Sequence, residues 1–140
     1  MTETHLVAKK LVVIERCLTE LRTLAKPERI VDDVREQRFV EHTLQIAIQA
    51  ALDVASHIVS DDRLGEPRTN KDLFDLLRAA GWITTELTRP LAAMVGFRNI
   101  LVHGYEAVDL AVVRDVVENH LGDLDAFVIA IRVRLAVPAP

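Results

Sequence analysis

The stretch of sequence that decides the fold runs from residue 38 to residue 60 and reads RFVEHTLQIAIQAALDVASHIVS. Its apolar residues recur at spacings of three and four, which places them on one side of an α-helix. The residues on this apolar line are Val40, Leu44, Ala47, Ala51, Val54 and Ile58. The sequence therefore predicts a long amphipathic helix from about Arg38 to Ser60, whose apolar side other segments cover.

The other side of this helix is polar but carries almost no charge. Its polar line follows the same spacing: His42, Gln45, Gln49, Asp53, Ser56 and Ser60. A fully solvated helix side usually carries Lys, Arg and Glu, whereas a hydrogen-bonding stripe with one carboxylate suits the wall of a cleft or a polar strip in an interface. An ordinary solvent-facing side is the alternative, and His57, four residues after Asp53, fits both interpretations.

Helical periods continue on the N-terminal side of this segment. One apolar stripe predicts a first helix: Val7, Leu11, Ile14, Leu18, Leu21 and Ala25. Pro27 ends that helix, and a short amphipathic piece from Ile30 to Gln37 is expected before the next one. Residues 61–67 (DDRLGEP) form the clearest loop in the chain.

The C-terminal half also has helical signals. Residues 69–72 (TNKD) resemble a capping box, so a short third helix is expected from there to about Gly81. A fourth helix begins at Thr84 or Thr85 and tolerates Pro90 in its early turns. Asp109 is expected to cap a single long last helix. Its apolar line comprises Leu110, Val113, Val117, Leu121, Leu124, Val128, Ile131 and Leu135, and residues 136–140 are expected to fray.

Composition agrees with an all-α protein of one domain over residues 1–140, with a core from about residue 6 to residue 135. Half of the 140 residues are hydrophobic but only 4% are aromatic, so the core consists of Leu, Val, Ile and Ala. The single Cys17 excludes an internal disulfide, and the sequence has neither a long apolar run nor a signal peptide. We therefore expect a cytoplasmic protein with no membrane partner. A net charge of −4 argues against a general nucleic-acid coat, although a local binding pocket is compatible with it.

An arginine interrupts the apolar line of the fourth helix. Extending Leu87, Leu91 and Met94 by the same spacing reaches Arg98. A guanidinium on such a line needs an anion, which is either a carboxylate or a bound phosphate. The structural alternatives are an arginine that extends to water at a helix end and a salt bridge with Asp53.

Arg98 also begins the motif RNILVHGY at residues 98–105. Arg98 suits a bidentate grip on a phosphate, His103 can transfer a proton near neutral pH, and Tyr105 is the only tyrosine. Asn99 lies one helical turn before His103 and supports the same cleft, together with Gln49 and Asp53. A histidine that merely stabilises a helix C-terminus is the alternative for His103.

Other chemistries find less support in the sequence. A glycine-rich phosphate loop, a His-Glu-x-x-His motif and a cluster of metal ligands are all absent from it. Cys17 lies near the first apolar stripe and suits packing, and Asp61-Asp62 is typical of loop charge. No metal and no cofactor are therefore expected.

Three segments together resemble a known family. They are similar to segments of HepT-like HEPN domains. The first is residues 97–105 followed by Val108-Asp109, the second is residues 44–58, and the third is residues 71–77, which begin with Lys-Asp and continue as a helix. The resemblance covers roughly residues 6–135 and keeps the order of the segments.

The resemblance implies a HEPN-type antiparallel bundle of about five helices that forms a homodimer. It implies a metal-independent endoribonuclease toxin, whose Arg98 and His103 meet those of a second copy in one composite cleft. It also implies a minimal nucleotidyltransferase antitoxin that transfers AMP to Tyr105. Some HEPN domains cut nothing and serve as nucleotide-binding or scaffold subunits beside a nucleotidyltransferase, which is the competing interpretation.

Overall fold

A computed structural model describes residues 4–103 and 108–137 of the chain. Within these ranges the protein is entirely helical, and its elements follow one another with short connections. They are α1 (Thr4–Leu24), a 3₁₀ turn η1 (Pro27–Arg29), α2 (Val34–Asp61), α3 (Asn70–Ala79), α4 (Thr85–His103), α5 (Leu110–Asn119) and α6 (Leu121–Leu135).

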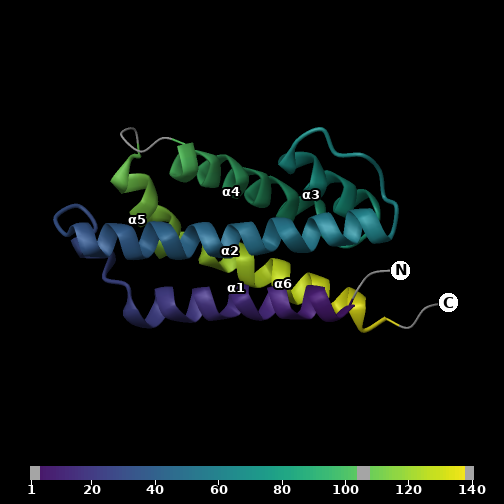
Figure 1. The fold of residues 1–140 in the computed structure, drawn as a ribbon, viewed down its shortest axis with the longest axis horizontal. Helices are drawn as coiled ribbons and strands as arrows, with labels where there is room; N and C mark the ends of the chain where they lie inside the picture. The colour runs from purple at the N-terminus through teal and green to yellow at the C-terminus, as the bar shows by residue number, and fades with distance from the viewer. Residues whose placement is uncertain (1–3, 104–107, 138–140) are drawn as a thin grey trace.

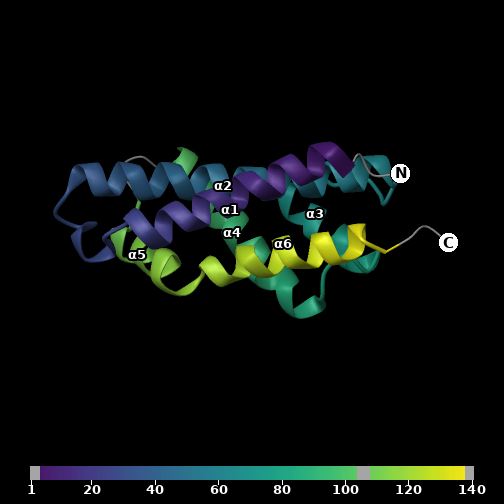
Figure 2. The same ribbon diagram turned by 90° about the horizontal axis from the view of Figure 1, so that it is seen from below.

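The bundle is organised around α2, which contacts all five other helices. In Figure 1, α3 and α4 lie along one side of α2 and α1 lies along the other. Figure 2 shows α6 running beside α1, with α5 near the end of the bundle where α2 begins. The predicted long helix is thus the centre of the fold.

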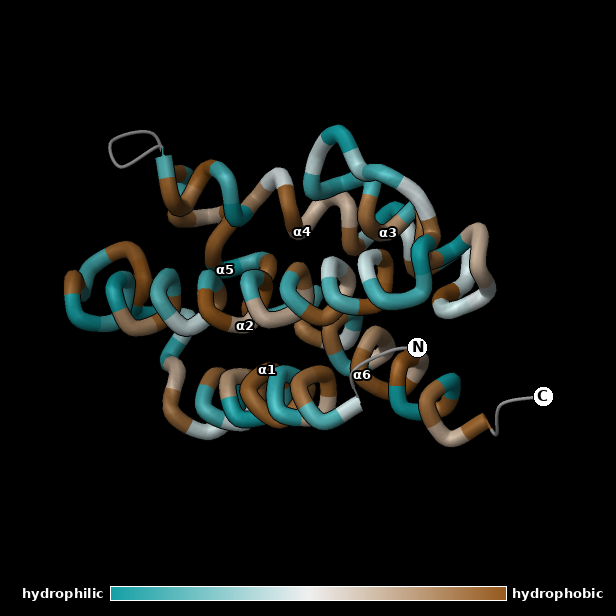
Figure 3. Tube along the Cα trace, turned by 45° about the vertical axis from the view of Figure 1, so that its right-hand side comes forward, coloured by the Kyte–Doolittle hydropathy of each residue, from teal (hydrophilic) through white to brown (hydrophobic). Residues whose placement is uncertain are grey.

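One apolar core unites the helices. The predicted apolar line of α2 is buried throughout, and so is the line of α1 as far as Leu21. Figure 3 shows hydrophobic and hydrophilic residues alternating along α1 and α2, as amphipathic helices require. Cys17 is buried in this core, as its place near the α1 stripe predicts, and burial raises the pKa of its thiol.

Several predicted helix boundaries are confirmed. The carboxylate of Asp72 accepts the backbone N–H of Thr69 at 3.2 Å, which is one half of the expected capping box. Gly81, just beyond α3, has a φ of +83°, a conformation that glycine adopts without strain. The Asp109 carboxylate accepts the N–H of Ala111 at 2.9 Å and so caps the following helix.

The start of α2 differs from the prediction. Residues 34–37 are the first turn of α2 rather than part of a separate piece from Ile30 to Gln37. The cause is Asp33, whose carboxylate accepts the backbone N–H of Arg35 at 2.9 Å and caps the helix there. The prediction followed the apolar line, which begins only at Val40, and so missed this cap.

The prediction of a single long last helix is also wrong. Two helices stand in its place, so the described chain has six α-helices where about five were expected. The chain leaves helical geometry at His120, where φ is −122° and ψ is 3°, so that α5 and α6 are separate. The imidazole lies 3.0 Å from the Asp115 carboxylate and 3.7 Å from that of Asp123. Val117 and Leu121 are buried on either side of the break, so the apolar period passes through it unchanged.

Within the described ranges, no helix combines the length and the apolar composition that crossing a membrane requires. Residues 138–140 of the tail that was expected to fray lie outside these ranges, and α6 ends at Leu135.

The core makes a matched pair of substitutions on α6 informative. Ile131 is fully buried, whereas Ile129, two residues earlier, is 62% exposed. Ile131→Ala should lower the free energy of unfolding by about 2–5 kcal/mol, because it leaves a cavity. Ile129→Ala should change it by less than about 0.5 kcal/mol. Urea unfolding followed by circular dichroism measures both, and equal losses would contradict the described packing of α6.

Candidate active site

Arg98 lies half-buried on α4 and reaches across to α2. Its Nη2 atom donates to Oε1 of Gln49 at 2.7 Å, and its Nη1 atom donates to Oδ1 of Asn99 at 3.3 Å. The Nε atom is buried and has no hydrogen-bond partner among the described residues. Both hydrogen bonds of Arg98 end on neutral amide oxygens, so they hold the guanidinium without cancelling its charge.

The polar line of α2 continues from this contact. Nε2 of Gln49 donates to Oδ1 of Asp53 at 2.9 Å, and Oδ2 of Asp53 lies 3.0 Å from Nζ of Lys10 on α1. The three supporting residues that the sequence suggested, Asn99, Gln49 and Asp53, are thereby joined to Arg98 in one hydrogen-bonded chain. Lys10 was not suggested, because nothing in the α1 pattern indicates which helix would lie opposite it.

Two alternatives raised by the sequence do not match this geometry. A direct Arg98–Asp53 salt bridge is absent among the described contacts, because Gln49 stands between the two side chains. His57, four residues after Asp53, is not hydrogen-bonded to it either: among the described contacts, the Asp53 carboxylate bonds to Gln49 and Lys10.

His103 ends α4 with its side chain exposed, and Asn99 is exposed one turn earlier. Both side chains are therefore accessible to a large substrate. Gly104 and Tyr105, which complete the motif, lie outside the described residues.

A hollow of about 970 Å³ opens beside this group, between the first half of α2 and the ends of α4 and α5. Its wall includes Gln45, one turn before Gln49, and Leu101, three residues after Arg98. The other lining residues are Val34, Gln37, Arg38, Phe39, Glu41, His42, Thr43, Val108 and Leu110. Part of the polar line of α2 thus forms a cleft wall, whereas Ser56 and Ser60 are exposed to solvent.

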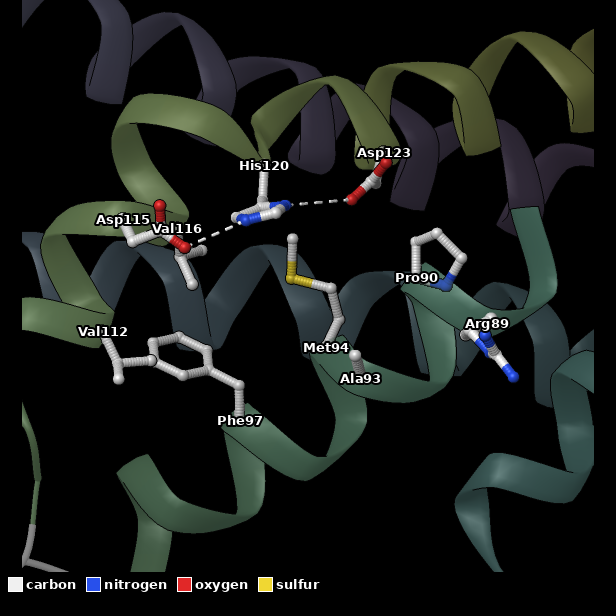
Figure 4. Close-up of a pocket in the computed structure, with 10 residues that line it drawn as sticks. All are labelled: Arg89, Pro90, Ala93, Met94, Phe97, Val112, Asp115, Val116, His120 and Asp123. Carbon is white, nitrogen blue, oxygen red and sulfur yellow. Dashed lines mark hydrogen bonds and ion pairs between the residues drawn. The ribbon is translucent and has the colours of Figure 1, made fainter. Parts of the chain in front are cut away.

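A separate hollow of about 540 Å³ lies between α4 and the α5–α6 junction, as Figure 4 shows. Met94 and Phe97 of α4 point into it, and His120 stands at its edge between Asp115 and Asp123. None of its lining residues belongs to the motif at residues 98–103. It is therefore distinct from the cleft beside Arg98. In the described part of the chain, no three His, Cys, Asp or Glu side chains converge as a set of metal ligands.

Comparison with known proteins shows the family to which the chain is similar. A family model described as ribonuclease HepT-like matches residues 14–131. The mRNA nuclease HepT of Shewanella oneidensis is 34% identical over 128 residues, which cover 91% of this chain and 96% of that protein. The tRNA nuclease HepT of Aphanizomenon flos-aquae is 35% identical over 112 residues, covering 76% and 74%.

A solved structure extends the similarity to three dimensions. It is that of the tri-AMPylated Shewanella oneidensis HEPN toxin in complex with an MNT antitoxin. It aligns with a TM-score of 0.85 and 33% identity, over 95% of this chain and 99% of the toxin chain.

The helical bundle is that of a HEPN domain. The chain belongs to the ribonuclease HepT-like family, and the expectation of a HEPN endoribonuclease is confirmed.

The Glu41 carboxyl in the wall of the larger hollow should make stability depend on pH. Burial raises the pKa of Glu41 above its ordinary value of 4.5, and the nearby charge of Arg38 opposes that shift. The folded state therefore binds more protons than the unfolded state, and stability falls as pH rises from 4.5 through the raised pKa. Glu41→Gln should stabilise the protein at neutral pH and have little effect near pH 4 or below, as urea unfolding at the two pH values would measure. A gain of equal size at both pH values would contradict a penalty on the charged form.

Proposed function

We propose that this chain is the toxin of a toxin–antitoxin pair and cleaves RNA with Arg98 and His103. The observation that carries the proposal is the state of Arg98, which is half-buried yet held by two neutral oxygens. A guanidinium whose charge is not cancelled stabilises the negative charge that builds up on a phosphate during cleavage. The named activities of the similar mRNA and tRNA nucleases support RNA as the substrate.

The reaction needs both a base and an acid, and one chain has one motif histidine. We propose that two copies form a homodimer in which their motifs face a shared cleft. His103 of one copy takes the proton of a ribose 2′-OH, and the 2′-oxygen then bonds to the adjacent phosphorus. The bond from phosphorus to the 5′-oxygen breaks, and His103 of the second copy gives that oxygen a proton. The products are a 2′,3′-cyclic phosphate and a 5′-OH.

The larger hollow beside Arg98 supports binding of nucleotides next to the cleaved bond. It combines an aromatic ring, Phe39, with the cation Arg38 and the hydrogen-bonding side chains of His42 and Gln45. Aromatic stacking and cationic contacts are the usual means of holding single-stranded RNA. The carboxyl of Glu41 in the same wall disfavours phosphate there, so a base fits this part of the hollow better.

Control by an antitoxin is the second half of the proposal. The partner is a minimal nucleotidyltransferase that attaches AMP to the Tyr105 hydroxyl, and the tri-AMPylated state of the similar Shewanella toxin supports such a modification. An added phosphate near Arg98 competes with RNA for the guanidinium, and the adenosine blocks the cleft by its volume. The pair acts in the cytoplasm, where RNA is available.

Removing either motif side chain should abolish cleavage without unfolding the protein. Arg98→Ala and His103→Ala should each slow cleavage of a fluorophore-labelled RNA by about 100-fold or more, because charge stabilisation or proton transfer is lost. Arg89→Ala on the same helix and His5→Ala on α1 are exposed controls that should keep full activity. The motif offers a single imidazole ligand, so EDTA should leave the rate unchanged. A 3′-OH product would contradict the mechanism, and toxicity retained by His103→Ala would favour a non-catalytic scaffold.

A mixed dimer tests the composite cleft directly. Wild-type and His103→Ala chains with different tags should be co-expressed and the mixed dimer purified through both tags. If one histidine is the base and the other the acid, the mixed dimer should be nearly as inactive as the dimer that carries His103→Ala in both copies. Half of the wild-type activity would mean that each copy works alone, and a monomer in light scattering would exclude the shared cleft.

Tyr105 should be the residue that accepts AMP. Intact-mass spectrometry of protein co-expressed with its nucleotidyltransferase should show one or more AMP additions, and cleavage activity should fall as they accumulate. Tyr105→Phe removes the nucleophilic hydroxyl, so these additions should disappear. Additions that persist in Tyr105→Phe and map to a serine, threonine or lysine would contradict this account of control but not the ribonuclease.

A further inference from the structure

A continuous polar chain crosses the bundle from α1 to α4 over the surface of α2. It runs from Lys10 to Asp53 at 3.0 Å, from Asp53 to Gln49 at 2.9 Å, and from Gln49 to Arg98 at 2.7 Å. Figure 1 shows why three helices are needed, since α2 separates α1 from α4. Arg98 is therefore connected to a side chain that comes 88 positions earlier in the sequence.

The chain has only one consistent direction. A carboxylate only accepts hydrogen bonds, so Asp53 takes the amide N–H of Gln49. The carbonyl oxygen of Gln49 must then point the other way, toward Arg98, where it accepts from the guanidinium. Asp53 thus sets the orientation of the group that holds Arg98, although it does not contact Arg98 itself.

The same carboxylate could also pair directly with Arg98 and displace Gln49. Asp53 is an anion one side chain away from Arg98, and a carboxylate is a stronger partner for a guanidinium than an amide is. A direct Arg98–Asp53 pair would cancel the charge that the phosphate requires. Lys10 opposes this capture, because its ammonium pairs with the free oxygen of Asp53.

We propose that Lys10 is a positioning residue that neutralises Asp53 and thereby keeps the charge of Arg98 available to the RNA phosphate. The catalytic role of Lys10 rests on the proposed ribonuclease function. The arrangement of the four side chains is independent of that function. Lys10 and Asp53 have side-chain exposures of 43% and 34%, so water screens the pair and its effect is moderate.

The test uses Lys10→Met, which keeps most of the aliphatic stem and removes the charge. The rate of RNA cleavage should fall by about two- to fivefold, the range expected of a half-exposed ion pair. Lys9→Met, the exposed neighbour, is the matched control and should keep the wild-type rate. Lys10→Arg keeps the charge and should keep most of the activity.

The double variant Lys10→Met/Asp53→Asn distinguishes positioning from simple damage. The amide that replaces the Asp53 carboxylate can still accept from Gln49 but can no longer neutralise Arg98. Because a guanidinium only donates, Arg98 keeps the Gln49 oxygen facing it in this variant. The double variant should therefore regain most of the rate that Lys10→Met loses. The thermal unfolding of each variant should be measured first. Cleavage rates are then measured well below the unfolding temperature, so that unfolded protein does not contribute to any difference. A double variant no faster than Lys10→Met would overturn the proposal.

A spectroscopic measurement makes the test independent of RNA cleavage. The ¹H–¹⁵N signal of the Arg98 Nε–H, assigned by its loss in Arg98→Lys, reports where the guanidinium is held. It should shift in Lys10→Met, return toward its wild-type position in the double variant, and stay in place in Lys9→Met. An unmoved signal in Lys10→Met overturns the proposal. A signal that moves as expected in a protein that cuts no RNA would retain the positioning role and reject the proposed function.

Discussion

The central constraint on this protein is that one helix, α2, serves both the core and the site. Its apolar line is buried against the other five helices, so its rotation about its own axis is fixed by packing. The backbone positions from which Gln49 and Asp53 project are therefore fixed relative to the core, and Gln49, which donates to Asp53, holds Arg98 through a side-chain hydrogen bond. The site is precise because the same helix that presents it is locked on its opposite side.

This arrangement has a cost in stability. Nε of Arg98 is a buried donor with no partner in the described part of the chain, and such a donor costs on the order of 1–3 kcal/mol. A carboxylate in place of Gln49 would bind the guanidinium more strongly, but it would also cancel the charge that the proposed chemistry uses. Under the proposed mechanism, neutral partners leave the guanidinium free to bind the substrate phosphate. Sites of this kind break local rules for packing and pairing because function requires it.

The helical periods allowed most of the fold to be predicted from the sequence, because burial on one side leaves a direct trace in residue spacing. The same reasoning identified Arg98, since a cation on an apolar line was expected to need an anion. The described structure instead gives it the neutral amide oxygens of Gln49 and Asn99. Periodicity was less informative where it stayed unbroken. The break at His120 depends on local backbone geometry and on the carboxylates of Asp115 and Asp123, while the apolar spacing continues across it. The contact between Lys10 and Asp53 was not predicted, because residue spacing within α1 does not indicate which residues of α2 lie opposite it.

The division between α5 and α6 has a practical consequence for anything joined to this protein. Because the chain changes direction at His120, α6 returns along α1, and the start of α1 and the end of α6 lie at the same end of the bundle in Figure 1. His103 closes α4 toward the other end. A fusion partner, affinity tag or surface anchor joined before α1 or after α6 is therefore attached at the end of the bundle away from the end of α4. An attachment there leaves the hollow beside Arg98 unobstructed, so immobilised protein can be presented with its proposed site outward.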